Sequence, residues 1–224
     1  MSKKETKPRI LIFDCDEDNY ATGKNTSLLF KNYLPYAEMT RACEGVFPAQ
    51  LDFDGYIIGG SSAHVSDAQN IKGKWINHLI DSVRKIDEAD KPILGVCFGH
   101  QILAHVFGGH VEQGKEEFGL HKINVTKKDK LFANLEEKIY LAEAHSDWVT
   151  ILPKNAEPIA KNNKGCIQGF CYRMHHGVQF HPEIQLAFLL GMTARKKQHE
   201  LNYQRYEERT GRIILTNWYN SLKL

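Results

Sequence analysis

The sequence predicts an α/β fold built on a mostly parallel central sheet. In the first half of the chain, three short apolar runs alternate with segments whose apolar residues recur at helical spacing. Short continuous apolar runs are typical of strands buried on both faces, and strands that alternate with helices normally form a parallel sheet. In the second half, shorter and more alternating segments predict antiparallel strands added to one edge or face of that sheet.

The three buried strands are predicted at 9–13, 53–58 and 92–96. The first run ends in acidic residues, and the second leads into the glycine-rich turn GGSS. The helices that alternate with these strands are predicted at 22–33, 70–86 and 101–107, and a pair of glycines ends the last of them.

The later elements are predicted as antiparallel strands at 122–125, 138–141, 166–172 and 176–180. The stretch 184–210 is predicted to be long and helical, and its many charges fit a solvated face or, alternatively, a docking surface or a lid. We expect a polar tail over residues 1–8 and a single domain over 9–224, whose last part, 184–224, is a helical extension.

Composition and charge restrict the class of protein. The chain has 224 residues, of which 42% are hydrophobic and 25% charged, so a packed core is expected. The formal net charge of +2 is too balanced to favour a nucleic acid or an anionic membrane as partner. No apolar run reaches the length of a membrane span, and the charged start of the chain does not resemble a secretion signal. We therefore expect a cytoplasmic protein.

The five cysteines do not form a recognisable framework. Their number is odd, their spacing is scattered and no pair has C-x-x-C spacing. These features argue against a set of disulfides and give no support to a zinc site. We expect four of the five to be ordinary small side chains.

The fifth, Cys97, stands in the segment GVCFGHQ, at the predicted turn from strand to helix. A nucleophile between two glycines at such a turn is typical of an elbow, where Gly95 and Gly99 allow a sharp bend. Helix N-terminal N–H groups stabilise a thiolate, and the amide of Phe98 would face a developing oxyanion. The alternative is an unreactive cysteine at a tight turn.

A thiol nucleophile needs a base and a group that orients the base. The segment FHPE places His181 directly after the predicted strand 176–180, and Glu183 follows two residues later. A carboxylate in this position would accept the second ring N–H of the histidine and stabilise its cationic form. A capping or surface histidine is the alternative interpretation.

The two motifs GVCFGHQ and GVQFHPE together resemble those of the class I (triad) glutamine amidotransferases. The resemblance covers roughly residues 9–183 and includes the segments DGYIIGGS, EFG and AHSD. The middle motifs are similar to those of GMP synthetase amidotransferase domains. The segment QGF and the region after Glu183 look more like stand-alone hydrolases of γ-glutamyl amides and peptides. The resemblance implies a flavodoxin-like three-layer sandwich.

It also implies a mechanism. Cys97 would attack the γ-carboxamide of glutamine and form a thioester, His181 would transfer the protons, and Glu183 would orient His181. The backbone amides of Gly60 and Phe98 would hold the oxyanion. The residues that would hold the substrate are Gly59, Ser61, Gln101, His145, Ser146 and Asp147, the last three in a loop. Neither a metal nor an organic cofactor is implied.

For Gln101 the alternative is a solvent-facing residue in the first turn of a helix, and for residues 145–147 it is a polar turn. The chain has no G-x-x-x-x-G-K-[ST] phosphate loop, and we expect no ATP-binding domain. Two interpretations remain open. Either the ammonia passes to a separate synthase subunit, or the enzyme acts alone on glutamine or γ-glutamyl peptides.

Two rival classes are also considered. Asp14 and Asp16, at the end of the first strand, have the spacing of a haloacid-dehalogenase-type phosphatase, although Asp18 and the two motifs above do not fit that class. The second rival is a non-catalytic regulatory module on the same fold. The presence of Cys97, His181 and Glu183 argues against it.

Overall fold

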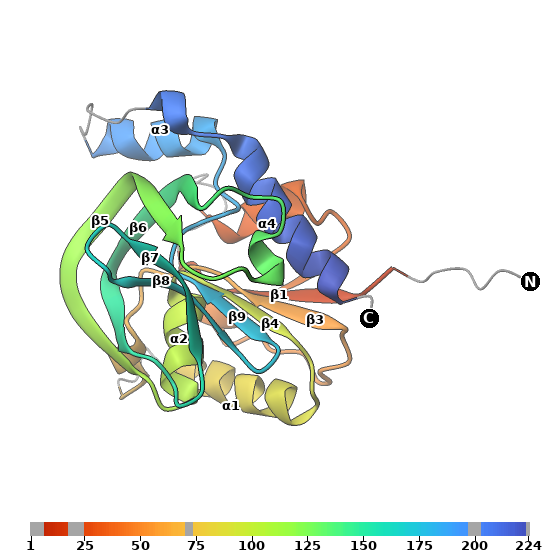
Figure 1. The fold of residues 1–224 in the computed structure, drawn as a ribbon. Helices are drawn as coiled ribbons and strands as arrows, with labels where there is room; N and C mark the ends of the chain where they lie inside the picture. The colour runs from red at the N-terminus through yellow and green to blue at the C-terminus, as the bar shows by residue number, and fades with distance from the viewer. Residues whose placement is uncertain (1–6, 18–24, 70–73, 197–202, 223–224) are drawn as a thin grey trace, which may run out of the picture.

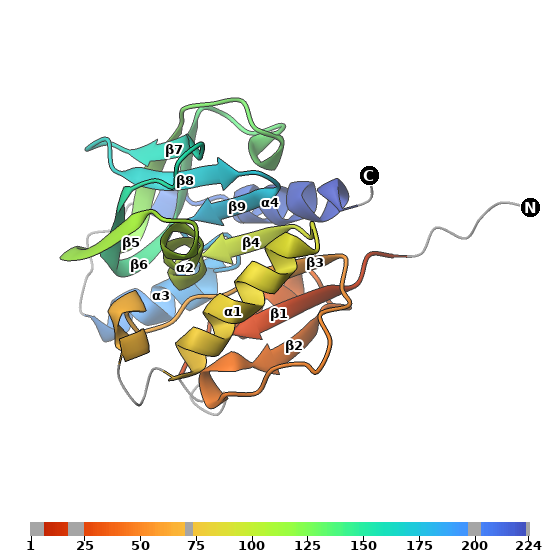
Figure 2. The same ribbon diagram turned by 90° about the horizontal axis from the view of Figure 1, so that it is seen from below.

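The computed structural model describes residues 7–17, 25–69, 74–196 and 203–222. These residues form a three-layer α/β sandwich around one mixed sheet (Figures 1 and 2). The predicted fold class is confirmed. Among the described residues no helix is long and apolar enough to cross a membrane.

The sheet has the strand order β2-β1-β3-β4-β9-β8-β7-β5-β6. Its first five strands are parallel. They are β2 (Glu38–Arg41), β1 (Ile10–Asp14), β3 (Gly55–Ile58), β4 (Ile93–Val96) and β9 (His175–Val178). The remaining strands continue the sheet in antiparallel fashion. They are β8 (Ile167–Tyr172), β7 (Glu157–Asn162), β5 (His110–Val125) and β6 (Lys138–Ile151).

Helices cover both faces of the parallel part (Figure 2). The α-helices are α1 (Lys74–Glu88), α2 (Phe98–Val106), α3 (Leu186–Arg195) and α4 (Glu208–Ser221). Short 3₁₀ helices occupy Ser27–Asn32, Ala42–Glu44, Val65–Gln69, Lys130–Phe132 and Tyr203–Arg205. Strand alternation divides the core between the two faces. Ile10 and Ile12 pack in the cluster that includes Trp218 of α4, whereas Leu11 and Phe13 pack in the cluster under α1.

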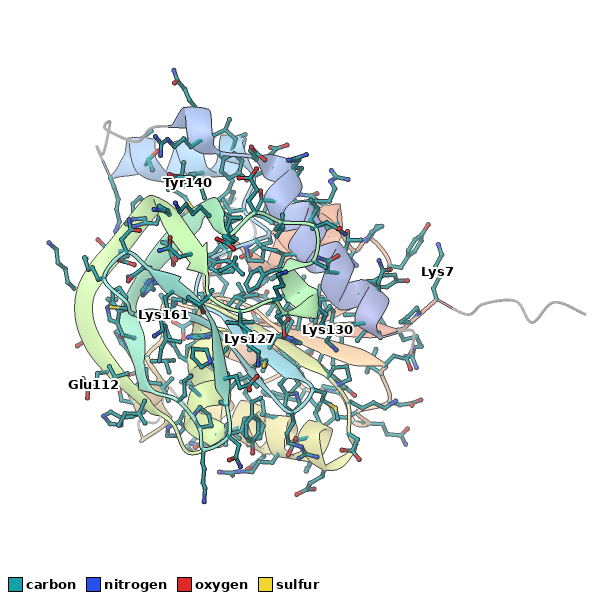
Figure 3. The ribbon with its side chains drawn as sticks, in the orientation of Figure 1. Lys7, Glu112, Lys127, Lys130, Tyr140 and Lys161 are labelled. Carbon is teal, nitrogen blue, oxygen red and sulfur yellow. The ribbon has the colours of Figure 1, made fainter. Side chains whose placement is uncertain are left out.

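The antiparallel strands β5 and β6 form a long curved ribbon beside the parallel sheet (Figure 1). Exposed charged side chains such as Glu112 and Lys127 stand on the outside of this part of the molecule (Figure 3).

Several elements differ from those predicted. The predicted strand 176–180 is β9, which pairs in parallel with β4 on one side and antiparallel with β8 on the other. It therefore belongs to the parallel part and not to an antiparallel addition. A strand of four buried residues carries no signal of its direction. Strands β2 and β7 were not predicted, because β2 is half exposed and polar and β7 contains a proline.

The stretch 184–210 contains two separate helices, α3 and the start of α4, and not one long helix over its described residues. In the predicted helix 22–33 the described part forms only the 3₁₀ helix Ser27–Asn32, and residues 22–24 lie outside the described residues. The predicted loop at residues 145–147 is the middle of β6. Alternation of polar and apolar residues in this segment, rather than its polarity, was the signal for a strand.

Candidate active site

Cys97 stands at the point where β4 ends and α2 begins. Its backbone has a φ of 53° and a ψ of −104°, a conformation that costs a residue with a side chain strain energy. Its N–H donates to the carbonyl of Val178 in β9 at 2.9 Å. A Cβ added to Gly99 would lie 2.3 Å from the Ile58 carbonyl oxygen, and one added to Gly95 would lie 2.4 Å from the Gly99 carbonyl oxygen. The bend therefore requires glycine on both sides of the cysteine, as expected for an elbow.

His181 and Glu183 follow β9, the strand beside β4. The N–H of His181 donates to the carbonyl of Ala142 in β6 at 2.9 Å, which fixes the backbone of this residue. His181 Nδ1 lies 2.7 Å from Glu183 Oε1, and the side chains are 4% and 0% exposed. A carboxylate at this distance holds the proton on Nδ1 and leaves Nε2 to act on a neighbouring group.

The pKa of His181 reflects this surrounding. Burial by itself lowers it, but the charges of Glu183 and Cys97 raise the pKa well above its ordinary value. His181 Nε2 is buried and makes no hydrogen bond of standard geometry with the described residues. Its interaction with the Cys97 thiol is close enough to raise the pKa of His181, but it does not reach hydrogen-bond geometry.

Gly60 completes the meeting point of these groups. A Cβ on Gly60 would lie 3.0 Å from His181 Cε1 and 3.7 Å from Cys97 Cβ. The loop after β3 thus contacts both the nucleophile and the base candidates. Phe98 has a fully buried side chain that packs against Trp75, with ring centroids 5.6 Å apart, so its backbone amide is the group that remains for an oxyanion.

Cys97 and His181 line a pocket of about 390 Å³, within the range of about 300–1,000 Å³ found for ligand pockets. Predicted site residues that line it are Gly60, Ser61, Cys97, Gln101, His145, Ser146, Asp147 and His181. Gly59 is not among the described lining residues; its hypothetical Cβ would lie 2.5 Å from Ser27 Oγ, so it supports the loop from beneath.

Strand β6 forms one wall of the pocket through its backbone carbonyls. Besides the Ala142 carbonyl that accepts from His181, the Ala144 carbonyl oxygen lies 3.8 Å from the Cys97 Sγ. The Asp147 carbonyl accepts from Gln101 Nε2 at 3.1 Å. Gln101 is almost fully buried and does not face solvent. A single strand therefore contacts the nucleophile, the base and the predicted substrate-binding amide.

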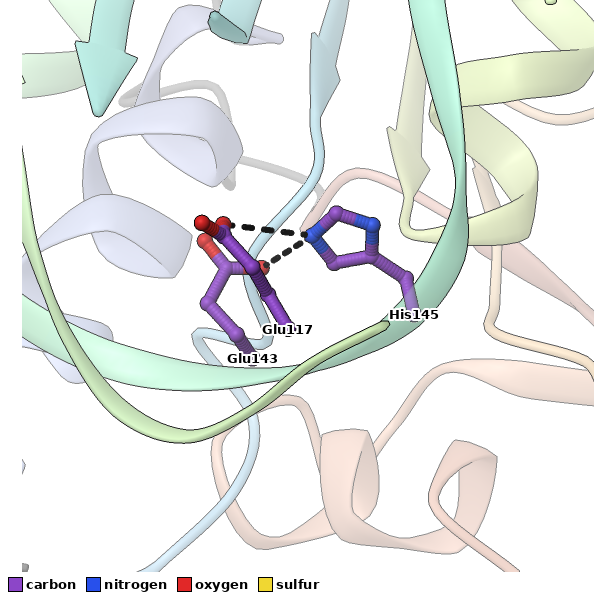
Figure 4. Close-up of side chains that lie close together, drawn as sticks. All are labelled: Glu117, Glu143 and His145. Carbon is purple, nitrogen blue, oxygen red and sulfur yellow. Dashed lines mark ion pairs between the residues drawn. The ribbon is translucent and has the colours of Figure 1, made fainter. Parts of the chain in front are cut away.

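His145 points to the other side of β6 and is held by two carboxylates. Its Nε2 lies 3.3 Å from Glu143 Oε2 and 3.8 Å from Glu117 Oε2 (Figure 4). Its Nδ1 lies 3.0 Å from the Asp147 carbonyl oxygen. Burial lowers the pKa of His145, but the interactions with Glu117 and Glu143 raise it to about 10.

The spacing of these three groups is also compatible with a metal ion, because their ligand atoms lie within 4.8 Å of one another. The charges, however, are already balanced: Lys164 Nζ lies 3.5 Å from Glu117 Oε1, so two anions meet two cations. Glu117 also accepts from Asn162 and Gln168. These contacts favour an ion cluster that needs no metal.

Some residues of the pocket were not expected from the sequence. His64 Nδ1 lies 2.9 Å from both carboxylate oxygens of Asp147. Lys196, at the end of α3, lines the mouth, pairs with Glu116 and lies over the Phe118 ring at 4.2 Å from its centroid. Glu143 was also missed, although the pattern E-A-H places it on the same face of a strand as His145.

The acidic pair after β1 does not form the site of a phosphatase. Asp14 is fully buried, and its Oδ2 lies 2.6 Å from Arg41 Nη1 and 3.1 Å from Asn25 Nδ2. A carboxylate held in this way is a poor nucleophile. Asp16 lines the thiol pocket, and its Oδ2 accepts from the Thr26 N–H at 2.9 Å.

Comparisons with known proteins agree with the resemblance of the motifs. Residues 29–188 match the family model of glutamine amidotransferase class-I. The chain is 32% identical over 171 residues to the glutamine-hydrolyzing subunit of GMP synthase from Sulfurisphaera tokodaii, covering 74% of this chain and 87% of that protein. It is 30% identical over 183 residues to gamma-glutamyl peptidase 5 of Arabidopsis thaliana, covering 77% and 71%.

The fold is shared with a solved structure of a glutamine amidotransferase from Thermotoga maritima. The two have a TM-score of 0.80 and 19% sequence identity, over 97% of this chain and 99% of that chain. The family match covers well over half of the chain, including Cys97, His181 and Glu183. The protein belongs to the glutamine amidotransferase class-I family.

Proposed function

We propose that the protein hydrolyses the γ-carboxamide of glutamine, with Cys97, His181 and Glu183 as the catalytic groups. The observation that carries the proposal is the meeting of the Cys97 elbow with the buried His181–Glu183 pair at one pocket. Family membership supports the reaction class. The names of the relatives, a peptidase and a glutamine-hydrolyzing part of a synthase, support hydrolysis at a γ-glutamyl group.

The first half of the proposed reaction forms a thioester. His181 Nε2 takes the thiol proton while Cys97 Sγ attacks the carboxamide carbon, and the carbonyl oxygen becomes an oxyanion. The amides of Gly60 and Phe98 would hold that charge, and one such donor contributes about 10²–10³ in rate. His181 then passes its proton to the leaving nitrogen, the C–N bond breaks and ammonia departs.

The second half returns the enzyme to its starting state. Water loses a proton to His181 and attacks the thioester carbon. The C–S bond breaks, the thiolate regains the proton from His181, and glutamate leaves. Glu183 keeps its charge throughout and stabilises the cationic imidazole. No group outside the chain is needed for proton or electron balance.

The decisive experiment measures glutamate release by the purified protein from glutamine, with Cys97→Ala as control. Release that depends on Cys97 is expected. Cys97→Ala protein with full activity would overturn the mechanism. A wild-type protein that neither turns over any γ-glutamyl compound nor reacts with a glutamine-like electrophile would favour the non-catalytic alternative.

A second candidate is hydrolysis of γ-glutamyl peptides. The pocket continues past the thiol to a mouth formed by Glu116, Met192 and Lys196, so it has room and charge for a group beyond the scissile amide. A panel of γ-glutamyl dipeptides assayed beside glutamine distinguishes the two candidates. If glutamine is turned over and the peptides are not, we propose that the ammonia passes to a separate synthase subunit, in line with the relatives that are named as subunits of GMP synthase.

A further inference from the structure

The described residues contain one buried ion cluster that the proposed mechanism does not use: His145 with Glu117 and Glu143 (Figure 4). Its members come from both strands of the curved ribbon, Glu117 from β5 and the other two from β6. The His145 side chain is 1% exposed, and those of Glu117 and Glu143 are 7% and 0% exposed. Charges buried to this degree are costly unless each is compensated.

The hydrogen positions of His145 follow from its neighbours. Nδ1 faces the Asp147 carbonyl oxygen, which can only accept, so Nδ1 must carry a hydrogen. Nε2 faces carboxylate oxygens of Glu143 and Glu117, which also accept. A bare lone pair on Nε2 would repel both anions. The geometry therefore requires a hydrogen on each ring nitrogen, which is the imidazolium form.

The cluster lies directly behind the wall of the thiol pocket. Along β6, Glu143 and His145 project to one side, and the carbonyls of Ala142, Ala144 and Asp147 contact the catalytic side. The Asp147 carbonyl is shared: it accepts from His145 Nδ1 at 3.0 Å and from Gln101 Nε2 at 3.1 Å. The placement of Gln101 in the pocket thus depends on the same oxygen that holds His145.

We propose that His145 is a permanent imidazolium that serves as a positioning residue, fixing strand β6 against Cys97, His181 and Gln101. The positioning role rests on the proposed function, whereas the protonation state does not. Anchored between two carboxylates, the cation keeps the wall strand and the Gln101 amide in register with the nucleophile. Loss of its proton would release both Nε2 contacts and leave two buried anions facing a neutral ring.

Other titratable groups around His145 do not replace this role. From the elbow and α2, Cys97 and His100 face it; burial lowers the pKa of His100 to about 3, so that ring is neutral. From the loop after β7, Lys164 pairs with the far side of Glu117, and His121 of β5 also acts on that carboxylate. His145 is the cation that contacts Glu143 in the described part of the chain.

The first test observes the protonation state directly. Nuclear magnetic resonance of labelled histidine side chains, with the His145 signal assigned by its loss in His145→Gln, reports both ring nitrogens from pH 6 to 9. The expected result is a doubly protonated ring throughout. A neutral ring at any pH in this interval overturns the proposal, whether or not the protein is active. Stoichiometric metal in the purified protein, with a metal-bound His145 signal, would overturn it as well.

The second test uses Glu143→Gln, which keeps the shape of the side chain and removes one carboxylate. His145 should then lose its proton within the accessible range, and KM for glutamine should rise about tenfold between pH 6 and 9 with the same midpoint, while wild-type KM stays level. A change equal at every pH would show a purely structural role and would overturn the positioning part.

The matched control is Glu112→Gln. Glu112 Oε1 lies 3.1 Å from His110 Nε2, but both side chains are exposed, and Glu112 points away from the body of the molecule (Figure 3). Its removal should leave the KM profile unchanged. If Glu143→Gln does not fold, the wild-type spectrum alone still decides the protonation state. If the protein turns over no γ-glutamyl compound, the proposed function fails while the imidazolium is tested independently.

Discussion

Glu183 Oε1 lies 2.7 Å from His181 Nδ1, and neither side chain reaches solvent. Water therefore cannot replace the carboxylate as partner of the ring, and the tautomer of His181 depends on Glu183 alone among the described neighbours of Nδ1. In the proposed reaction this contact orients the base and stabilises its charged form.

Glu183→Gln should lower kcat less than His181→Ala does. The amide can still contact the ring but cannot stabilise a cation, which costs about 10⁴-fold in a triad, whereas loss of the base costs about 10⁶-fold. Steady-state release of glutamate from glutamine measures both. Equal loss in the two variants would contradict the assignment of orienting and proton-transferring roles.

The strained backbone of Cys97 predicts an unusual response to glycine. At a φ of 53° and ψ of −104°, glycine is free of the strain of about 1–3 kcal/mol that other residues bear. Although glycine adds entropy to the unfolded chain, Cys97→Gly should be about 1 kcal/mol more stable than Cys97→Ala. Chemical denaturation of the two inactive proteins measures the difference.

Ala104→Gly, in the interior of α2, is the control for this comparison. There the backbone is helical, so glycine should be less stable than alanine by about 1 kcal/mol or more. If Cys97→Gly is destabilised relative to Cys97→Ala by as much as Ala104→Gly is relative to the wild-type protein, the elbow stores no strain.

The part of the site that is local in sequence could be predicted, and the part that depends on strand pairing could not. Cys97 with its two glycines, and His181 with Glu183, each lie within one short segment, and the structure places each segment at the end of a strand as expected. The three buried strands β1, β3 and β4 were equally evident from their continuous apolar residues.

The contacts between β6 and the site were not evident. His145 was placed in a loop, because a segment with serine, histidine and aspartate resembles a turn when its alternation is overlooked. Its pairing with Glu117 depends on the register of β5 against β6, which places Glu117 opposite His145. Nothing within either segment states that register. Similarly, β9 lies beside β4 only because the chain returns to the centre of the sheet.

Gly60→Ala should impair catalysis more than stability. The added methyl would lie 3.0 Å from His181 Cε1, so the ring must shift away from the thiol. We expect kcat to fall about 100-fold, comparable to loss of one oxyanion donor, while the unfolding free energy changes by less than about 1–2 kcal/mol. Kinetics and chemical denaturation on the same preparation separate the two effects.

Gly191→Ala provides the matched comparison. Gly191 lies inside α3, and a Cβ there would meet no atom within 4 Å. Alanine should stabilise the helix by about 0.5–1 kcal/mol and leave kcat unchanged. Similar losses of activity in the two alanine variants would rule out a specific role for the space at Gly60.

Glu117 should contribute to stability in a defined range of acidic pH. Burial raises its pKa, but hydrogen bonds from His145 and Asn162 lower it from 4.5 to about 2. A carboxylate with a lowered pKa stabilises the folded state above the unfolded value, and this contribution is lost as pH falls from about 4.5 to 2. At 1.36 kcal/mol per pKa unit, the loss is on the order of 3 kcal/mol.

The measurement compares the unfolding free energies of wild-type and Glu117→Gln proteins between pH 5 and 2. Their difference should shrink as pH falls, because the wild-type protein alone has this contribution to lose. Exposed Glu136, replaced by Gln, should give a difference that is constant over the interval. A constant difference for Glu117→Gln as well would show that its carboxylate is not specially stabilised in the folded state.

Lys196 should distinguish γ-glutamyl peptides from glutamine. Its ammonium lines the mouth of the pocket, paired with Glu116, and both side chains are about half exposed, so a substrate carboxylate can compete for it. An exposed ion pair contributes up to about 1 kcal/mol, which corresponds to roughly fivefold in kcat/KM. Lys196→Met should therefore lower kcat/KM about fivefold for a γ-glutamyl dipeptide with a free carboxylate and leave glutamine unaffected. The same dipeptide with its carboxylate converted to an amide should not distinguish the two proteins, and Lys154→Met, which changes an exposed lysine that does not line the pocket, should affect none of the three substrates. An equal loss for all three substrates in Lys196→Met would place the effect on the packing of α3 instead of on recognition of the leaving group.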